Sequence, residues 1–453
     1  MNNLVQKYNV PGPRYTSYPT VPYWDSSNFT ASNWNQLLVD SFKKHNSTDG
    51  ISLYIHLPFC ESLCTFCGCN KRITKRHEVE NPYIEALLKE WQLYVQLLPE
   101  KPLIKEIHLG GGTPTFFSPE NLTHLINGIK KNSTISKDHA FSFEGHPNNT
   151  TEEHLQALYN VGFRRVSYGV QDYNMAVQIA IHRIQPFENV KKATDIARKI
   201  GYTSVGHDII FGLPMQTLNH VKETIQKTKE LLPDRIAFYS YAHVPWIKGN
   251  GQRGFDEKDL PTPQLKSQLY EVGKKMLEEI GYTEIGMDHF ALPTDSLYEA
   301  MENKKLHRNF MGYTTTQTKI MIGLGVSSIS DSWNAFAQNV KTIEEYYQML
   351  EQDKIPVFRG HFLNKEDQVI RQHILNLMCQ LETSWQEDKL YFPELPSILE
   401  NLTEMQEDGL LLIEKSALKI TEKGRPFVRN VCMAFDLLLQ RHQPETQLFS
   451  MTV

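Results

Sequence analysis

A regular alternation of strand-like and helix-like segments, between about residues 50 and 290, constrains the fold of this chain more than any other feature. Short runs of β-branched and aromatic residues are separated by longer segments with helical periodicity. The strands recur about every 25–35 residues, the spacing that helical crossovers between parallel strands require. The six predicted strands are Ile51–His56, Lys105–Leu109, Ala140–Glu144, Arg165–Gln171, Ser204–Phe211 and Arg235–Tyr241. The alternation therefore predicts an α/β fold in which a parallel sheet closes into a partial (β/α)6-type barrel.

Helical periodicity fills the intervals between these strands, and further signals follow the sixth strand. The predicted crossover helices span residues 83–98, 119–131, 152–161, 187–200 and 217–231. A helix at 263–280, a strand at 282–286 and an apolar segment around Ile320–Ser330 are expected to extend or close the barrel.

The two ends of the chain lack this alternation, so we expect three parts: an arm at 1–48, the barrel at 49–362 and a small, mostly helical domain at 363–453. Prolines and aromatics before residue 48 predict an irregular arm. After Asn364, helices flank a hairpin at about residues 409–421, the order of a winged-helix domain. The hairpin tip carries little positive charge, which favours covering the substrate or packing over binding nucleic acid.

Length and charge narrow the class of function. A chain of 453 residues that is 40% hydrophobic can bury the core of a large enzyme. A formal net charge of −5 gives no basic field to attract nucleic acid. The chain begins without an apolar signal core, and no apolar run approaches the roughly 18 residues that cross a bilayer. We therefore expect a cytoplasmic protein, a monomer by default, with no membrane and no nucleic-acid partner.

Four of the six cysteines lie close together, at Cys60, Cys64, Cys67 and Cys69. This clustering is unlike a secreted disulfide framework and indicates a metal site. The two remaining cysteines lie in apolar helical patterns and are predicted to be buried: Cys379 and Cys432.

The cysteine loop follows the first predicted strand, at the carboxyl end where parallel barrels carry their active sites. Thiolates at positions i, i+4 and i+7 can bind three corners of an iron–sulfur cube and leave the fourth iron open for another ligand. We therefore predict a 4Fe-4S cluster on Cys60, Cys64 and Cys67. Cys69 lies too near Cys67 to reach a different corner easily, so it is expected to be a nearby non-ligand. A zinc site that uses all four cysteines is the alternative.

The next strand ends in the run His108-Leu109-Gly110-Gly111-Gly112-Thr113, whose glycines let a ligand approach the backbone. Polar residues also end the later strands, at Glu144, Gln171, Asp208 and Tyr241-Ala242-His243. The carboxyl ends of parallel strands meet at one rim, where carboxylates can accept ribose hydroxyls or an amine and Arg183 can pair with a carboxylate. The alternative for each residue is a surface or capping role, and for the glycines a tight βα turn.

The spacing C-x3-C-x2-C, with Phe66 before the third cysteine, resembles the signature of the radical S-adenosylmethionine (SAM) superfamily. The glycine run one βα unit later resembles that superfamily's motif for the methionine end of SAM. This resemblance implies that the open iron binds SAM. It also implies that an electron from the cluster releases methionine and a 5′-deoxyadenosyl radical.

The resemblance extends over nearly the whole chain to the family of oxygen-independent coproporphyrinogen III oxidases, also called coproporphyrinogen dehydrogenases. The segments that carry it lie at 12–20, 169–172, 212–214, 241–243, 286–291 and 307–315, with the extra Cys69. The chain departs from some relatives after Glu144, where Gly145-His146-Pro147-Asn148 replaces an Asp-Pro-Arg triplet. We expect that departure to affect local details only.

The resemblance implies an oxygen-independent oxidative decarboxylation in heme biosynthesis. The ring A and B propionates of coproporphyrinogen III would become vinyls, giving protoporphyrinogen IX. The radical would take a hydrogen from the propionate β-carbon, after which carbon dioxide and one electron leave. Such carbon–hydrogen bonds resist acid–base chemistry, which explains the need for a radical cofactor. A flavodoxin or ferredoxin system is the expected electron donor, and the sequence does not identify the acceptor.

The resemblance also implies two SAM molecules and the residues that contact them. The SAM on the cluster would meet Tyr54, Gly111, Glu144 and Ile329. The second SAM would meet Phe66, Gly112, Thr113, Gln171, Arg183, Asp208 and Ala242. The expected catalytic residues among these are Tyr54, Glu144 and Arg183. Arg14 and Arg308 are candidates for binding the substrate propionates, on charge complementarity alone.

Three other functions fit parts of the pattern. A heme chaperone of the same superfamily shares the loop and much of the barrel, but it usually lacks the Arg-Tyr-Thr-Ser-Tyr-Pro arm and the fourth cysteine, both present here. A radical methyltransferase of anaerobic heme breakdown shares the fold, and its products would separate it. A winged-helix regulator whose cluster senses redox state is disfavoured by the low basic charge and the polar strand ends.

Overall fold

The computed structural model describes residues 2–246, 251–252, 254–386 and 390–452. A twelve-stranded sheet has the strand order β16-β15-β14-β13-β1-β4-β5-β6-β7-β8-β10-β9. Strands β1 and β4 to β8 run parallel, each paired with the next. These six strands span Ile51–Leu57, Leu103–Gly111, Thr134–Gly145, Phe163–Gln171, Ser204–Phe211 and Arg235–Ser240. They confirm the predicted (β/α)6 unit.

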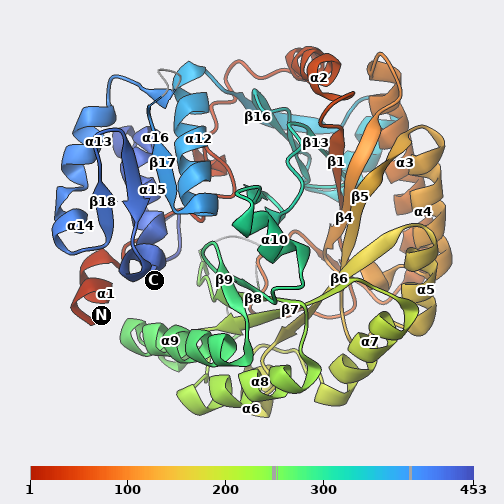
Figure 1. Cartoon of the computed structure of the whole chain (residues 1–453). Coiled ribbons are helices and arrows are strands. Elements are labelled where there is room, and N and C mark those ends of the chain that lie inside the picture. The colour runs from red at the N-terminus through yellow and green to blue at the C-terminus, as the bar shows by residue number, and fades with distance from the viewer. Residues whose placement is uncertain (1, 247–250, 253, 387–389, 453) are drawn as a thin grey trace.

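Helices cover the outer face of the parallel strands, and the sheet curves into a partial barrel (Figure 1). The crossover helices α3, α4, α5, α7 and α8 span Glu80–Leu97, Pro119–Lys131, Glu152–Asn160, Phe187–Ile200 and Leu218–Leu231. A shorter helix, α6, precedes α7 at Met175–Ala180. Each crossover helix begins close to its predicted position.

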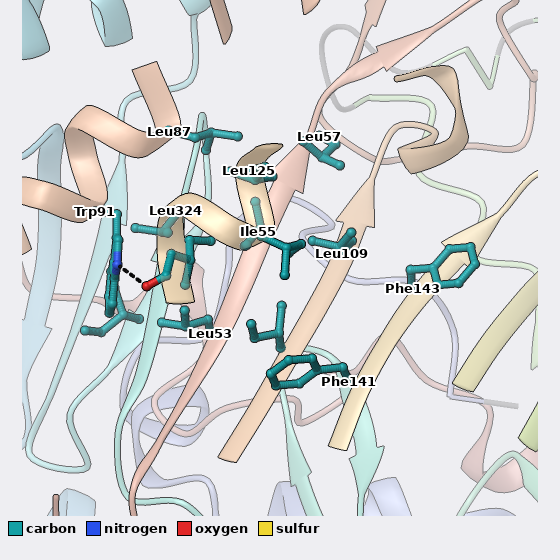
Figure 2. Packing of buried hydrophobic residues seen from close by; sticks show 14 of the residues in the cluster. Leu53, Ile55, Leu57, Leu87, Trp91, Leu109, Leu125, Phe141, Phe143 and Leu324 are labelled. Carbon is teal, nitrogen blue, oxygen red and sulfur yellow. Dashed lines mark hydrogen bonds between the residues drawn. The ribbon is translucent and has the colours of Figure 1, made fainter. Parts of the chain in front are cut away.

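The core lies between the strands and these helices. Figure 2 shows Leu53 and Ile55 of β1 and Leu109 of β4 packed beneath Leu87 and Trp91 of α3. All five side chains are at least 99% buried. Full burial of each such side chain contributes roughly 1.5–3 kcal/mol, so this layer fixes the position of the strand ends that form the site.

The predicted extension of the barrel is confirmed at both edges of the parallel strands. β13 pairs parallel with β1, while β10 pairs antiparallel with β8. The added strands β9, β10, β13, β14, β15 and β16 span Thr283–Ile285, His289–Ala291, Met321–Leu324, Ile329–Asp331, Ala335–Asn339 and Val357–Phe362. Helices α9, α10 and α11 span Pro263–Ile280, Ser296–Glu302 and Ile343–Glu351. Two small sheets pair β2 with β3 and β11 with β12, at Phe59–Cys60, Arg72–Ile73, His307–Asn309 and Gly312–Thr314.

The inner face of the parallel strands is polar near their carboxyl ends. Every second side chain of a strand points to the same face, and the residues opposite the apolar core therefore line the interior. The ring of Tyr54 stacks on that of His108, with centroids 6.1 Å apart. His108 Nδ1 lies 2.9 Å from Ser142 Oγ, and the Ser167 hydroxyl donates to Asp208 Oδ1 at 2.9 Å. A row of polar side chains thus crosses the interior from β1 to β7.

The N-terminal arm is more ordered than the prediction of an irregular segment. It contains α1 at Asn2–Tyr8 and α2 at Ala31–His45. Trp34, Leu38 and Phe42 recur every four residues along α2 and are fully buried in the barrel core. The prolines at 11–22 lie in the irregular stretch between the two helices, whereas the four-residue spacing of these apolar side chains is a helical pattern.

The C-terminal part has the expected helices and hairpin, and it shares its core with the arm. Val5, Tyr15 and Tyr18 pack with residues of α12 and α15. Its elements α12, β17, α13, α14, β18, β19, α15 and α16 span Lys365–Gln380, Glu382–Ser384, Leu395–Asn401, Thr403–Glu407, Leu411–Ile413, Ala417–Ile420, Val428–Phe435 and Leu437–Arg441. Cys379 and Cys432 are buried, as predicted. No helix in the described part of the chain is long and apolar enough to cross a membrane.

Candidate active site

The cysteine loop follows the carboxyl end of β1 and is held by contacts at two points. The bridge between β2 and β3 places Cys60 opposite Ile73. Farther along the loop, the Thr65 hydroxyl donates to the Ala180 carbonyl at the end of α6, at 3.0 Å. The other two predicted cluster ligands flank Thr65 at positions 64 and 67. The loop therefore holds all three predicted ligands at the carboxyl-end rim of the sheet.

Two of the predicted ligands receive hydrogen bonds from neighbouring elements. Thr113 Oγ1 donates to Cys60 Sγ at 3.4 Å, and Arg183 Nη1 donates to Cys64 Sγ at 3.7 Å. The bond from Thr113 favours the Cys60 thiolate, which is the form that binds metal, although burial outweighs this bond and raises the pKa of the Cys60 thiol to about 11. The side chains of Thr113 and Arg183 are thereby tied to the cysteine loop.

Cys69 lies beside the third ligand. Its hydrogen bond lowers the pKa of the Cys67 thiol, and Cys69 itself is exposed. Cys69 therefore lies close enough to influence the Cys67 thiol, and its role as a non-ligand stays a prediction.

The donors present fit a 4Fe-4S cluster. Among the described residues, no group of three or more His, Cys, Asp or Glu side chains is arranged to hold a single metal ion. A cube binds its cysteines at separate iron corners, so its ligands need not converge on one point. Cys60, Cys64 and Cys67 are free thiols that are partly exposed on one loop. These three residues would hold the cluster.

The glycine run at the end of β4 brings backbone close to its neighbours. A Cβ on Gly112 would lie 2.6 Å from the carbonyl carbon of Pro58, and Gly111 has a φ of +112° that side chains rarely adopt. The Gly111 amide donates to Glu144 Oε2 at 3.2 Å. Glycine is therefore required here both for backbone conformation and for close packing. The turn positions Glu144 at the rim.

Glu144 keeps one side open to the interior. Its Oε1 lies 3.4 Å from His108 Nε2, and 46% of the side chain is exposed. Tyr54 Oη lies 3.1 Å from His56 Nδ1 on the same face of β1. Ile329 lies near Tyr54 through Gly323. Tyr54 pairs with Gly323 across β1 and β13, and the backbone of Ile329 packs where Gly323 has no side chain. The four residues predicted for the first SAM are thus gathered around the ends of β1, β4 and β5.

The residues predicted for the second SAM come from two parts of the rim. Phe66 lies on the cysteine loop, and Gly112 and Thr113 follow β4. The others are Gln171, Arg183, Asp208 and Ala242, from β6, β7 and the segments after β6 and β8. Arg183 Nη2 donates to the Gly169 carbonyl at 2.8 Å. Gln171 Oε1 and Arg183 Nε are buried without a hydrogen-bond partner in the described structure. Gln252 Nε2 donates to the carbonyls of Phe66 and Ala242, at 2.9 and 3.0 Å. Unsatisfied buried polar atoms are costly, so Gln171 Oε1 and Arg183 Nε are available to a polar ligand.

Among the residues predicted for the second SAM, Asp208 has a clear pKa shift. Burial, assisted by the charge of Glu144, raises the pKa of Asp208 to about 7. The Ser167 hydroxyl holds one of its oxygens. The carboxyl is therefore part protonated at neutral pH and can either accept from or donate to a ribose hydroxyl.

The sequence did not indicate several residues that hold predicted site residues in place through hydrogen bonds. His56, His108, Ser167 and Gln252 contact predicted site residues through the bonds given above. The first three could have been found from strand alternation, since they share the inner face with Tyr54 or Asp208. Gln252 lies in an irregular segment where no local pattern marks it.

Comparison with known proteins first defines the class. A family model of the radical SAM superfamily matches residues 54–228, the segment that carries the cysteine loop and most strand ends. A solved structure, coproporphyrinogen III oxidase from Escherichia coli, superimposes with a TM-score of 0.88 at 35% identity. It covers 96% of this chain and 98% of its own, and it is described as a radical SAM enzyme. Fold and site together define a radical SAM enzyme.

Curated relatives then give the family. Oxygen-independent coproporphyrinogen III oxidase of Helicobacter pylori strain J99 is 39% identical over 443 residues, 96% of each chain. The enzyme of the same description from Escherichia coli K12 is 36% identical over 458 residues, 99% of this chain and 98% of the relative. The chain belongs to the family of oxygen-independent coproporphyrinogen III oxidases.

Proposed function

We propose that this chain converts the ring A and B propionates of coproporphyrinogen III to vinyls without oxygen, giving protoporphyrinogen IX in heme biosynthesis. The proposal is carried by one observation: the similarity to coproporphyrinogen III oxidases spans nearly the whole chain, including the loop of three free thiols at the barrel rim. Cys60, Cys64 and Cys67 would hold the cluster, which with SAM would supply the radical chemistry that removes a hydrogen atom from the propionate β-carbon. The product forms when carbon dioxide and one electron leave.

We assign the first SAM to Tyr54, Gly111, Glu144 and Ile329. The open face of Glu144 can accept hydrogen bonds from the amino group of SAM, while the Gly111 amide fixes the other carboxylate oxygen at 3.2 Å. Tyr54 is held through His56 and packs on His108, so its position on the interior is fixed. The glycine turn leaves the backbone accessible to the ligand.

We assign a second SAM to Phe66, Gly112, Thr113, Gln171, Arg183, Asp208 and Ala242. Arg183 is the positioning group, because its guanidinium links Cys64 on the loop to the Gly169 carbonyl and keeps Nε unused. Such a guanidinium can pair with the carboxylate of SAM. Asp208 would contact the ribose. Equilibrium dialysis of the reconstituted protein is expected to give two SAM per chain, whereas one would contradict this assignment.

For the remaining partners we propose a flavodoxin or ferredoxin system as electron donor and a separate, unidentified acceptor. We infer that the protein works as a cytoplasmic monomer. The free, partly exposed thiols of the loop support a reducing compartment, where cysteines persist unpaired.

The experiment is product analysis under anaerobic conditions. The chain is reconstituted with iron and sulfide and incubated with reductant, SAM and coproporphyrinogen III, and porphyrins and 5′-deoxyadenosine are separated by chromatography. We expect protoporphyrinogen IX, with two deoxyadenosines for each product because two propionates react. A protein with a cluster that binds heme and forms no vinyl product would contradict the proposal and point to a chaperone.

A further inference from the structure

A cavity of about 410 Å³ lies between the barrel and the C-terminal part of the chain. Its apolar walls include Phe211 and Phe238 from β7 and β8 and Phe427 from the C-terminal part. Three basic side chains also line the cavity: Arg14 from the arm, Lys266 from α9 and Arg429 from α15. The volume lies within the range of small-molecule sites, roughly 300–1,000 Å³.

Two of these cations stand at the carboxyl end of β8, next to the predicted cofactor site. Arg14 Nη2 donates to the Ser240 carbonyl, and Lys266 Nζ donates to the Tyr241 carbonyl at 3.1 Å. The following residue, Ala242, is a predicted contact of the second SAM. Phe211 and Phe238 face the outer side of the sheet, against α9, whereas Asp208 lies on the inner face. The two cations therefore lie at the carboxyl-end rim, between the outer cavity and the interior.

Arg308 on β11 adds a third cation beside Arg14. Its Nη2 donates weakly to the Arg14 carbonyl at 3.4 Å, and its guanidinium lies 4.5 Å from the ring centroid of Tyr313. Arg308 is 93% buried. Its Nε and Nη1, and Nε of Arg14, are buried without a hydrogen-bond partner in the described structure. These donors are free for a ligand.

Carboxylates share this region with the cations, since Glu271, Glu278 and Glu422 also line the cavity. Within the described ranges, no ion pair involves Arg14, Lys266 or Arg308. One buried carboxylate, Asp288, lies near the two arginines and is already bonded to His289 at 2.7 Å. Buried cations without partners are costly, so this arrangement fits an anionic ligand.

We infer that Arg14, Lys266 and Arg308 bind the two propionates of the tetrapyrrole that are not decarboxylated. This inference rests on the proposed function, which supplies the substrate. A reacting propionate leaves as neutral carbon dioxide, so a cation paired with it would stabilise the reactant more than the transition state. The two retained propionates keep their charge throughout and are suited to such anchors.

The test measures binding separately from turnover. Coproporphyrin III, the oxidised fluorescent form with the same four propionates, is titrated into the reconstituted protein, and kcat and KM for coproporphyrinogen III are measured alongside. Lys266→Met and Arg308→Gln remove one cation each, Lys266→Arg keeps the charge, and Lys199→Met on the exposed face of α7 is the control.

We expect each charge-removing variant to weaken coproporphyrin binding about tenfold and to raise KM more than it lowers kcat, since a hydrogen-bonded charge contact is worth that much. Lys266→Arg should recover most of the affinity, and Lys199→Met should match the wild type. Unchanged binding in Lys266→Met and Arg308→Gln, in a preparation whose wild type makes vinyl product, would overturn this inference alone. A wild type that holds the cluster and cleaves SAM without making vinyl product would overturn the proposed function.

Discussion

At the scale of single residues, the cysteine loop gives the most direct test of the ligand set. Changing Cys60, Cys64 or Cys67 to Ser should each abolish the cluster, because three thiolates are needed to hold the cube. Cys69→Ser should retain it, because Cys69 is predicted to lie beside Cys67 without binding the cluster. Iron and sulfide content with the visible absorption spectrum measure the result. Loss of the cluster in Cys69→Ser would show that it is a ligand.

Lys266 predicts a pH dependence of substrate binding. Burial, with the charges of Arg14 and Arg429, lowers the pKa of Lys266 to about 7. The cavity also exposes the carboxylates of Glu271 and Asp288 to this region. Lysine is charged below its pKa, so the affinity for coproporphyrin III should be highest below pH 7 and fall as the pH rises through 7, while the propionates stay ionised.

The Lys266→Arg variant is the matched control for this pH dependence. Arginine stays charged throughout the range, so its affinity should remain nearly flat between pH 6 and about 9. The measurement is the dissociation constant from fluorescence titration at several pH values. A wild type as flat as the variant would exclude Lys266 as the titrating group.

At the residue scale, the sequence can point to candidate side chains where they lie at strand ends. Glu144 and Asp208 could be selected because each lies at or near the end of a strand whose position was clear. Lys266 could not, because a lysine on an amphipathic helix is usually solvated. Its burial depends on the cavity formed by the distant C-terminal part, which no local pattern reveals.

At the scale of elements, Glu90 of α3 joins the helix to the turn between β13 and β14. Glu90 accepts from the Gly325 amide at 2.8 Å, Asn339 Nδ2 at 2.7 Å and Tyr346 Oη at 2.6 Å. Burial outweighs these bonds and raises the pKa of Glu90 to about 7. The turn that leads to Ile329 is therefore fixed from the outer layer of the barrel.

The raised pKa of Glu90 determines how stability depends on pH. The folded protein binds the Glu90 proton more tightly than the unfolded chain, so this contribution is full below about pH 4.5 and is lost as the pH rises through about 7. Glu90→Gln should remove that dependence and destabilise the fold by about 1–3 kcal/mol at pH 5, because Gln cannot accept all three bonds. Urea unfolding at pH 5 and pH 8 measures both effects. If the free energy of unfolding differed between pH 5 and pH 8 by the same amount in Glu90→Gln and the wild type, the predicted role of Glu90 would be contradicted.

Element prediction was accurate for the βα units and weaker elsewhere. The helices at 119–131 and 187–200 have capping signals and clear periodicity, and their bounds match. Strands such as β9 and β17 have three residues each, which is too short for an alternation signal. Their pairing depends on neighbours far away in sequence.

At the scale of the whole molecule, Arg429 of α15 holds the arm against the C-terminal part. Its guanidinium donates to the carbonyls of Gly12 and Pro13 and to those of Met451 and Thr452. Both ends of the chain thus meet at one side chain, in agreement with the neighbouring termini in Figure 1. The arm is thereby kept in place with Arg14 at the cavity.

Arg429→Met should release the arm to proteases. Four hydrogen bonds from a charged donor are lost, so trypsin should cleave after Arg14 at least about tenfold faster than in the wild type. Mass spectrometry of the fragments measures the rate. Arg441→Met, which removes an exposed pair with Glu366, is the control. Equal cleavage rates in Arg429→Met and the wild type would contradict the role of Arg429.

The three-part division expected from sequence stays a prediction. Boundaries at 48 and 362 followed from changes in local pattern, whereas the arm and the C-terminal part bury a common core. Packing between the ends of a chain is invisible to local periodicity, so the shared core could not be predicted.

The measurement that tests the central claim most directly is transfer of deuterium from substrate to cofactor. Coproporphyrinogen III deuterated at the propionate β-carbons is incubated with the reconstituted protein, reductant and SAM, and 5′-deoxyadenosine is examined by mass spectrometry. We predict one deuterium in each deoxyadenosine formed with a vinyl group, because hydrogen abstraction at that carbon precedes loss of carbon dioxide. Vinyl product together with unlabelled deoxyadenosine would contradict the account.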